Sequence, residues 1–281
     1  MDEAWSTGAT SESVAAAVPA GLVLIPRDGG EGCRFVLGAS TDIGRAEGEI
    51  VLAEDRYVSP RHARIVWRGG AYFIRDLEST NGIFFRIPFL RARPSSSGAG
   101  GDSLPLETTR QTSGETPPDI ARLEPASEQP LADQELFLIG QQVLRFEVVK
   151  HANAAFGVAS ESGTLLFGTP AAPRFGRLSQ RTVEGVVRDV FYLRRAETVI
   201  GRESGDVVFT DDPFVSRRHA VLRMHDATAR DQGRRFTIAD LGSSNGTFVQ
   251  VRDEVRLRHG DQFRIGQQLF RFDHDVMVTG A

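Results

Sequence analysis

The chain has 281 residues, of which 40% are hydrophobic and 25% charged, and its formal net charge is −4. This length suits two domains of ordinary size, and this composition excludes a chain that is disordered throughout. Binding to nucleic acid or to an anionic membrane needs a basic excess, so the 33 basic and 37 acidic residues argue against both partners.

A single cysteine, Cys33, excludes an intrachain disulfide and a cysteine zinc site, and a reducing compartment suits it best. The N-terminus lacks a basic segment followed by an apolar one, and no apolar run is long enough to span a membrane. We therefore expect a cytoplasmic protein without a signal peptide or a membrane span.

Short β-rich segments recur in chain order. The first 20 residues lack a periodic apolar pattern and are predicted to be unstructured. Segments typical of strands then follow at residues 21–25, 64–67, 71–74 and 186–193. Because no stretch of 12 residues keeps a helical stripe, we predict an all-β chain with two β sandwiches, each of about 100 residues.

Two copies of one sequence pattern organise the chain. Each copy has Ile-Gly-Arg, then Ser-x-x-His fourteen residues after the arginine, then Ser/Thr-Asn-Gly, and finally an Ile-Gly-Gln-Gln string. In the first copy these landmarks lie at residues 43–45, 59–62, 80–82 and 139–142, and in the second at 200–202, 216–219, 244–246 and 265–268. Four landmarks in the same order predict two related domains.

The first copy is longer because of an insertion at about 88–130 that is rich in Pro, Ser, Thr and Gly. Such a segment buries too little apolar surface to offset its ordering entropy, so we predict a disordered insertion. The Ala-, Gly- and Ser-rich residues 151–175 are predicted to form a flexible linker. The predicted organisation is therefore an unstructured segment 1–20, a first domain 21–150, this linker, a second domain 176–275 and a tail 276–281.

The landmarks contain the groups that a phosphate-reading loop cluster needs. Arginine's planar fork can hold a phosphate dianion through two charge-assisted hydrogen bonds, and hydroxyls and backbone N–H groups can satisfy the other oxygens. An asparagine side chain can hold the main chain of an extended peptide. The predicted contact residues are Arg45, Ser59, Thr80 and Asn81 in the first copy and Arg202, Ser216, Ser244 and Asn245 in the second.

This order of Gly-Arg, Ser-x-x-His and Ser/Thr-Asn-Gly resembles the signature of the forkhead-associated (FHA) family. The resemblance covers residues 21–150, apart from the insertion, and about 176–275. It implies an eleven-stranded β sandwich for each copy and recognition of phosphothreonine peptides by the residues named above. It also implies that the histidines brace the loops from within, and the glycines are read as backbone requirements of turns. These structural positions are Gly44, His62, Gly82, Gly201, His219 and Gly246.

The second copy follows the family pattern more closely than the first. Arg217 comes directly after the serine, where the resemblance implies another phosphate or peptide contact. The first copy has Pro60 there, which offers neither an N–H nor a side-chain donor, and Arg61 one position later is its candidate contact. We therefore expect both copies to bind, the second more strongly, with the first weakened or specialised.

Phosphopeptide binding has two alternatives, an enzyme and a structural scaffold. An enzyme using the Ser-x-x-His pairs lacks a nucleophile elbow, a third orienting group, a metal-ligand pair and a P-loop, so no catalytic residue, metal or cofactor is predicted. A structural scaffold whose pockets have lost phosphate binding stays open as the alternative. The expected partners are phosphothreonine-containing proteins, among them a Ser/Thr kinase or its substrates.

The insertion itself contains candidate phosphoacceptors. Thr108 and Thr109 follow an acidic residue, and Thr116 has Asp119 three positions later, the spacing at which the resemblance implies discrimination. A kinase that modified one of them would add a charge of about −2, and the long loop would present it to a pocket on the same chain at high effective concentration. The alternative is an inert insertion.

Overall fold

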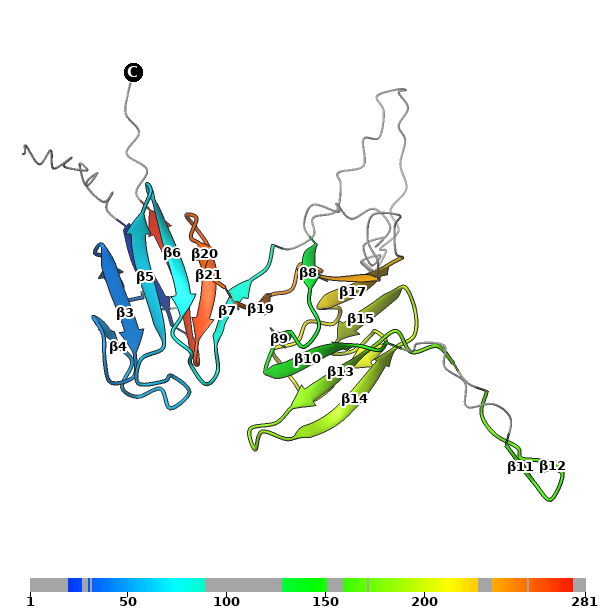
Figure 1. Cartoon of the computed structure of the whole chain (residues 1–281). Coiled ribbons are helices and arrows are strands. Elements are labelled where there is room, and N and C mark those ends of the chain that lie inside the picture. Colours follow the sequence, from blue (N-terminus) through cyan, green and yellow to red (C-terminus); the bar gives the residue numbers. More distant parts are fainter. Residues whose placement is uncertain are drawn as a thin grey trace, which may run out of the picture. The chain divides into compact units, whose positions relative to one another are not determined.

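The described part of the chain consists only of strands and loops. The computed structural model describes residues 20–26, 30, 32–88, 128–150, 159–170, 172–226, 234–251 and 253–274. Every regular element within these ranges is a β-strand (Figure 1), which confirms the all-β prediction.

Several sequence predictions fall on residues outside these ranges. They concern most of the N-terminal segment, most of the insertion, the C-terminal tail 276–281 and the threonines Thr108, Thr109 and Thr116. Two predicted boundaries are corrected by the described residues. Ala20 already belongs to strand β1 (Ala20–Ile25), and residues of the predicted insertion form strand β8 (Gln129–Leu131), because each pairs with a neighbouring strand.

The chain divides into two compact units whose boundaries differ from the predicted domains. Unit 1 consists of Met1–Phe85 together with Gln250–Ala281, and unit 2 consists of Arg86–Val249. In sequence terms, unit 2 is inserted between the two segments of unit 1. The predicted domains 21–150 and 176–275 keep each closing string with its own copy. In the structure, the closing string of each copy instead belongs to the unit that is built mainly from the other copy.

Unit 1 contains two five-stranded layers. One has the order β20 (Val255–Arg256), β6 (Ala71–Asp76), β5 (Ala63–Arg68), β3 (Ser40–Gly44) and β4 (Ile50–Val51). The other has the order β7 (Ile83–Arg86), β21 (Gln262–Ile265), β22 (Gln268–His274), β1 and β2 (Arg34–Val36). Ile65 and Ile74 from the first layer and Leu22 and Phe270 from the second are fully buried in one core.

Unit 2 repeats this arrangement. One layer has the order β16 (Val207–Val208), β15 (Glu197–Gly201), β17 (Ala220–His225), β18 (Arg235–Asp240) and β8. The other has the order β14 (Val187–Leu193), β13 (Gly176–Arg181), β10 (Gln142–Val148), β9 (Leu136–Ile139) and β19 (Thr247–Val251). Phe146 and Phe236 meet across the layers with ring centroids 4.8 Å apart. Each unit thus has ten strands in its described layers, one fewer than the resemblance implies.

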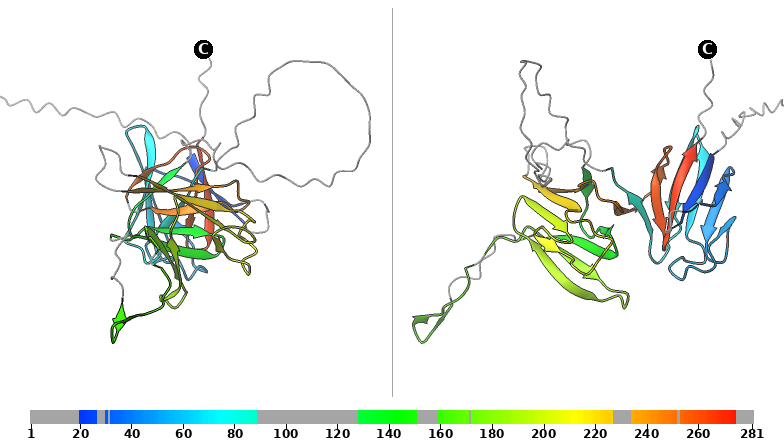
Figure 2. Two further views of the ribbon diagram at one scale, coloured as in Figure 1. Left: turned by 90° about the vertical axis from the view of Figure 1, so that its right-hand side faces the viewer. Right: turned by 180° about the vertical axis from the view of Figure 1, so that it is seen from behind.

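The predicted linker contains regular secondary structure. Its described residues include a short exposed hairpin of β11 (Ser160–Glu161) and β12 (Thr164–Leu165), visible in Figure 2. In the sandwich strands, by contrast, burial follows the period of two that a sheet with one buried face requires. Ala63 and Ile65 of β5 are buried, whereas Arg64 between them is partly exposed.

The closing string of each copy forms the turn of a hairpin, between β9 and β10 in the first copy and between β21 and β22 in the second. Gly140 and Gly266 have φ of 58° at the turns, a left-handed conformation that glycine adopts without strain. Strand β22 of the second copy pairs with β1 of the first, and the red and blue strands lie side by side in Figure 2 although they come from opposite ends of the sequence. Strand β10 of the first copy pairs with β13 of the second.

Each hairpin is held by an aspartate of the other copy. In unit 1, Asp55 Oδ2 accepts hydrogen bonds from the Gln267 backbone N–H at 2.7 Å and from Gln268 Nε2 at 3.1 Å. In unit 2, Asp212 makes the same bonds with Gln141 and Gln142 at 2.8 and 2.7 Å. Because both copies carry the same aspartate and the same glutamines, the sequence cannot indicate which hairpin completes which sandwich.

Candidate functional site

The first landmark places an arginine loop directly against the serine loop. The backbone N–H of Arg45 donates to the carbonyl of Ser59 at 2.9 Å, and that of Arg202 donates to Ser216 at the same distance. Gly201 permits this approach, because a Cβ atom on it would lie 2.1 Å from the carbonyl oxygen of Arg217. Gly44 lies in the equivalent position, where a Cβ would lie 2.1 Å from the oxygen of Pro60.

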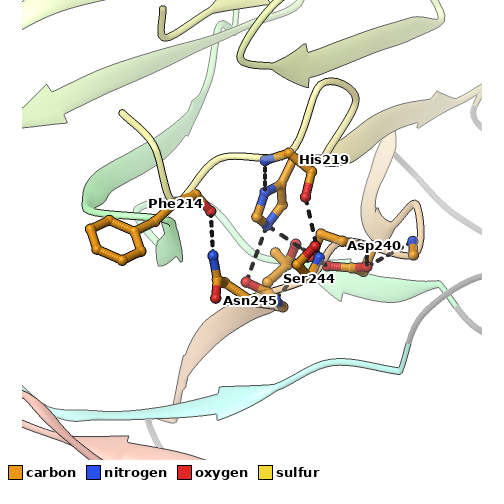
Figure 3. A network of polar contacts seen from close by, with 10 residues as sticks. Phe214, His219, Asp240, Ser244 and Asn245 are labelled. Carbon is orange, nitrogen blue, oxygen red and sulfur yellow. Dashed lines mark hydrogen bonds and ion pairs between the residues drawn. The ribbon is translucent and has the colours of Figure 1, made fainter. Parts of the chain in front are cut away.

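The third landmark joins the same cluster through its asparagine and the residue before it. In unit 2, Asn245 Nδ2 donates to the carbonyl of Phe214 at 2.9 Å, and the Ser244 N–H donates to Ser216 Oγ at 3.2 Å (Figure 3). Unit 1 has the matching bonds from Asn81 to Tyr57 at 2.9 Å and from the Thr80 N–H to Ser59 Oγ at 3.0 Å. The serine and asparagine loops are therefore connected in both units.

A buried histidine lies beneath each pair of loops. His219 is fully buried, its Nδ1 accepts a hydrogen bond from the Ser216 N–H at 3.0 Å, and its Nε2 lies 3.1 Å from the carbonyl of Gly246. Since Nδ1 is an acceptor and the carbonyl cannot donate, the proton resides on Nε2. His62 makes the same contacts with Ser59 and with Gly82, both at 3.0 Å.

Burial lowers the pKa of both histidines below the usual 6.5, and the hydrogen bonds to the glycine carbonyls oppose this shift. Each ring is therefore neutral near pH 7 and is enclosed by the loops that it joins. Gly82 and Gly246 have φ of 75° and 80°, which explains why glycine supplies the accepting carbonyl.

An aspartate and a serine support the asparagine loop, and neither was among the residues predicted from the sequence. Ser243 Oγ donates to Asp240 Oδ2 at 2.6 Å and accepts from the Gly246 N–H at 2.9 Å. Asp240 is 1% exposed and also accepts a hydrogen bond from Thr247 Oγ1 at 2.8 Å. The signal was present as a repeated Asp-Leu-x-Ser, at residues 76–79 and 240–243.

In unit 2 the predicted contact residues line one cavity. Its volume is about 260 Å³, which is sufficient for a phosphate group and part of a side chain. All five predicted residues of this copy contribute to it, together with the loop that precedes the serine: Arg202, Pro213, Phe214, Val215, Ser216, Arg217, Ser244 and Asn245.

Unit 1 differs in where its arginines point. Arg45 Nε donates to the carbonyl of Val58 at 3.1 Å, and Arg61 lies 3.7 Å from Asp42 and 3.8 Å from Glu47. A cavity of about 390 Å³ in this unit is lined by Arg61, Arg75, Asp76, Leu77 and Glu78. Of the residues predicted for this copy, that cavity contains only Arg61. Ser59, Thr80 and Asn81 are joined by hydrogen bonds but do not line it.

The described residues contain no group of three His, Cys, Asp or Glu side chains that could hold a metal ion. Nor does the described part of the chain include a helix that could cross a membrane.

Comparison with known proteins assigns the fold and its loops to a family. A family model of the FHA domain matches residues 41–94 and 198–266, one region in each sequence copy. An oxoglutarate dehydrogenase inhibitor of Corynebacterium diphtheriae is 34% identical over 127 residues, covering 44% of this chain and 81% of that protein. The glycogen accumulation regulator GarA of Mycolicibacterium smegmatis is 38% identical over 92 residues, covering 32% of this chain and 51% of GarA. The chain belongs to the FHA family.

Two solved structures are also similar in sequence to parts of the chain. One comes from a structural and functional analysis of phosphothreonine-dependent FHA domain interactions; it is 29% identical, covers 34% of this chain and 95% of its own, and has a TM-score of 0.19. Mycobacterium tuberculosis EmbR in complex with a low-affinity phosphopeptide is 31% identical, covers 36% and 28%, and has a TM-score of 0.17.

Proposed function

We propose that unit 2 binds phosphothreonine-containing segments of partner proteins and that the chain acts as an adaptor or regulator in Ser/Thr kinase signalling. The observation that carries this proposal is the cavity of about 260 Å³ that Arg202, Ser216 and Arg217 line together with Ser244 and Asn245. The proposed role is that of a binding module, without catalysis, metal or cofactor.

The lining supplies complementary groups for a phosphate dianion. Two guanidinium groups from Arg202 and Arg217 offer charge-assisted hydrogen bonds, and the Ser216 hydroxyl offers a neutral one. Asn245 already uses its amide N–H on the carbonyl of Phe214, so its amide oxygen is the group proposed to accept from the peptide main chain. The neutral histidine beneath fixes the serine loop without adding charge to the site.

The relatives support the regulatory part of the proposal. The names of two similar proteins describe a glycogen accumulation regulator and an inhibitor of oxoglutarate dehydrogenase. The similar EmbR structure holds a phosphopeptide. A reducing, cytoplasmic setting is proposed as well, since the free Cys33 is exposed.

Unit 1 is proposed as a second, weaker site. Ser59, Thr80 and Asn81 keep the loop connections of unit 2, whereas the cavity described for unit 1 is lined by Arg61 alone among the predicted contact residues. A scaffold role without phosphate binding is the alternative for this unit, and the separation of Arg61 from the other predicted residues favours it more here than in unit 2.

The threonines of the insertion extend the proposal to an internal ligand. Phosphorylation of Thr108, Thr109 or Thr116 by a kinase would present a phosphothreonine to a cavity of the same chain. The test is the affinity of the full chain for a partner phosphopeptide before and after kinase treatment. Unchanged affinity despite complete modification would rule this extension out.

The main test is a phosphothreonine peptide library screened against the full chain, followed by titration of the best peptide. Arg202→Ala is expected to weaken binding by about 2–4 kcal/mol, because it removes a charged partner from a shared anion site. Arg188→Ala, an exposed arginine in strand β14, is the matched control and should bind like the parent chain. Equal binding of phosphorylated and unphosphorylated peptides would refute the proposed function.

A further inference from the structure

A carboxylate already bridges the two arginines that line the cavity of unit 2. Glu203 follows Arg202 directly, and its Oε1 accepts a hydrogen bond from an Arg202 terminal nitrogen at 2.9 Å. Its other oxygen, Oε2, lies 3.5 Å from Nε of Arg217. One carboxylate thus contacts both guanidinium groups and offsets one of their two positive charges.

We propose that Glu203 lowers the affinity of this site for its ligand, acting as a built-in competitor for an incoming phosphate. A carboxylate and a phosphate use the same guanidinium N–H donors, so a ligand must displace Glu203 to engage both arginines fully. This inference rests on the proposed function, because it concerns the anion that the cavity would hold.

Unit 1 has no carboxylate at the position equivalent to Glu203. Ala46 occupies the position after the arginine, and Arg45 donates instead to the neutral carbonyl of Val58. The nearest acidic residue in that loop, Glu47, lies 3.8 Å from Arg61 and not beside Arg45. The carboxylate next to the anion-facing arginine is therefore particular to the second copy.

Exposure limits the expected size of the effect. The side chain of Glu203 is 54% exposed, and those of Arg202 and Arg217 are 34% and 78% exposed. Exposed ion pairs contribute little each and are screened by salt, so removing the competitor should tighten phosphopeptide binding by about three- to tenfold.

The cost of displacing Glu203 is the same for any anion that engages both arginines, so this competition should not change the preference between anions. A phosphothreonine with a charge near −2 and the single carboxylate of a glutamate-substituted peptide should therefore both bind more tightly once Glu203 is neutralised. The ratio of the two affinities should change little.

The experiment titrates the full chain with the selected phosphothreonine peptide and with its glutamate analogue. Glu203→Gln keeps the size of the side chain and removes its charge; Glu161→Gln, in the exposed hairpin β11–β12, is the matched control. We expect Glu203→Gln to bind the phosphopeptide about three- to tenfold more tightly at low salt, with a smaller gain at high salt. The control should match the parent chain, and the melting temperature of both variants should be unchanged.

The outcomes separate this inference from the proposed function. Loss of binding in Arg202→Ala combined with unchanged or weaker binding in Glu203→Gln would overturn the role of Glu203 and leave the phosphopeptide site standing. Binding by Glu203→Gln but not by the parent chain would support a strong competitor. Absence of binding by both chains would overturn the proposed function, and the role of Glu203 with it.

Discussion

Unit 1 and unit 2 share their supporting structure and differ in the groups that face a ligand. The histidine brace, the arginine–serine backbone bond and the asparagine–carbonyl bond have nearly the same distances in both. The arginines differ: Arg202 and Arg217 line one cavity in unit 2, whereas in unit 1 Arg45 Nε donates to the carbonyl of Val58 and Arg61 lies near Asp42 and Glu47. The shared sequence signature therefore predicts the supporting framework of the site in both units, but it does not predict how strongly each unit binds a ligand.

The largest expected effect concerns which copy supplies the closing hairpin of each unit. In the structure Glu147 of β10 lies opposite Arg177 of β13, whereas in two tandem domains Asp273 of the second closing hairpin would take that position. In a Cys33→Ser background, Glu147→Cys with Arg177→Cys should form a disulfide, because directly opposed residues in neighbouring strands meet the required geometry. Non-reducing electrophoresis and mass spectrometry of the digested chain would detect it.

The matched control for this test is Asp273→Cys with Arg177→Cys in the same background. That pair should remain reduced in the monomer if each closing hairpin completes the sandwich of the other copy, as it does in the structure. A disulfide in the control and none in the first pair would show that each copy keeps its own hairpin, and would restore the predicted boundaries 21–150 and 176–275.

The next effect concerns the aspartate that supports each asparagine loop. Asp240 accepts hydrogen bonds from Ser243 Oγ at 2.6 Å and from Thr247 Oγ1 at 2.8 Å, and all three side chains are buried. Asp240→Ala leaves these hydroxyls without their acceptor and should cost about 3–4 kcal/mol of stability. In unit 1, Asp76 is partly exposed and the position of Thr247 is taken by Ile83, so Asp76→Ala should cost about 1–2 kcal/mol.

Urea unfolding can assign these losses to a unit. In a Trp5→Phe background Trp67 is the one remaining tryptophan of the chain, and it packs against the core of unit 1. Its fluorescence should therefore report the unfolding of unit 1 and the loss of stability caused by Asp76→Ala. Circular dichroism should show the loss of stability caused by Asp240→Ala. Equal losses for the two variants would contradict the difference in burial on which this prediction depends.

A smaller effect is expected from the protonation of the braces. Burial lowers the pKa of His62 and His219, so the unfolded chain binds more protons than the folded chain as the pH falls. The stability that each neutral ring contributes is complete above its unfolded pKa near 6.5 and is lost as the pH falls through the folded pKa. In that window the free energy of unfolding should decrease by up to about 1.4 kcal/mol per pH unit for each histidine.

Urea unfolding between pH 7.5 and 5.5 measures this slope. His62→Gln should remove the part of the slope that belongs to unit 1 and leave that of unit 2. His259 in unit 1 is exposed, and His259→Gln serves as the control variant outside the braces. A slope that survives replacement of both His62 and His219 would assign the pH dependence to other groups.

The sequence predicted the fold class, because it depends on local residue types, and it predicted the five residues of the second copy that line one cavity. Gly201, Arg202, Ser216 and Asn245 are recognisable from order and spacing alone. The exchange of the closing hairpins was not predictable, since Asp55 and Asp212 would accept the glutamines of either hairpin equally well. The repeated Asp-Leu-x-Ser indicates Asp76 and Asp240 equally, and only their burial in three dimensions distinguishes the two.

The orientation of the arginine side chains could likewise not be predicted from the sequence, because it depends on neighbours distant in the sequence. Nothing in the string around Arg61 indicates that its side chain lies near Asp42, which is 19 positions earlier on strand β3. The repeat thus revealed which residues belong to each loop cluster but not which of them face a common cavity.

The smallest effect would come from giving unit 1 the arginine that it lacks. Pro60 occupies the position of Arg217, and the carbonyls of both residues accept backbone hydrogen bonds from the arginine loop, so the backbone already suits a replacement. In an Arg202→Ala background, which silences unit 2, Pro60→Arg should tighten phosphopeptide binding to unit 1 by roughly threefold to tenfold. Fluorescence anisotropy with a labelled peptide measures it, and Pro60→Ala controls for loss of the proline ring. A gain in Pro60→Ala equal to that in Pro60→Arg would mean that ring rigidity, and not the missing charge, limits the first site.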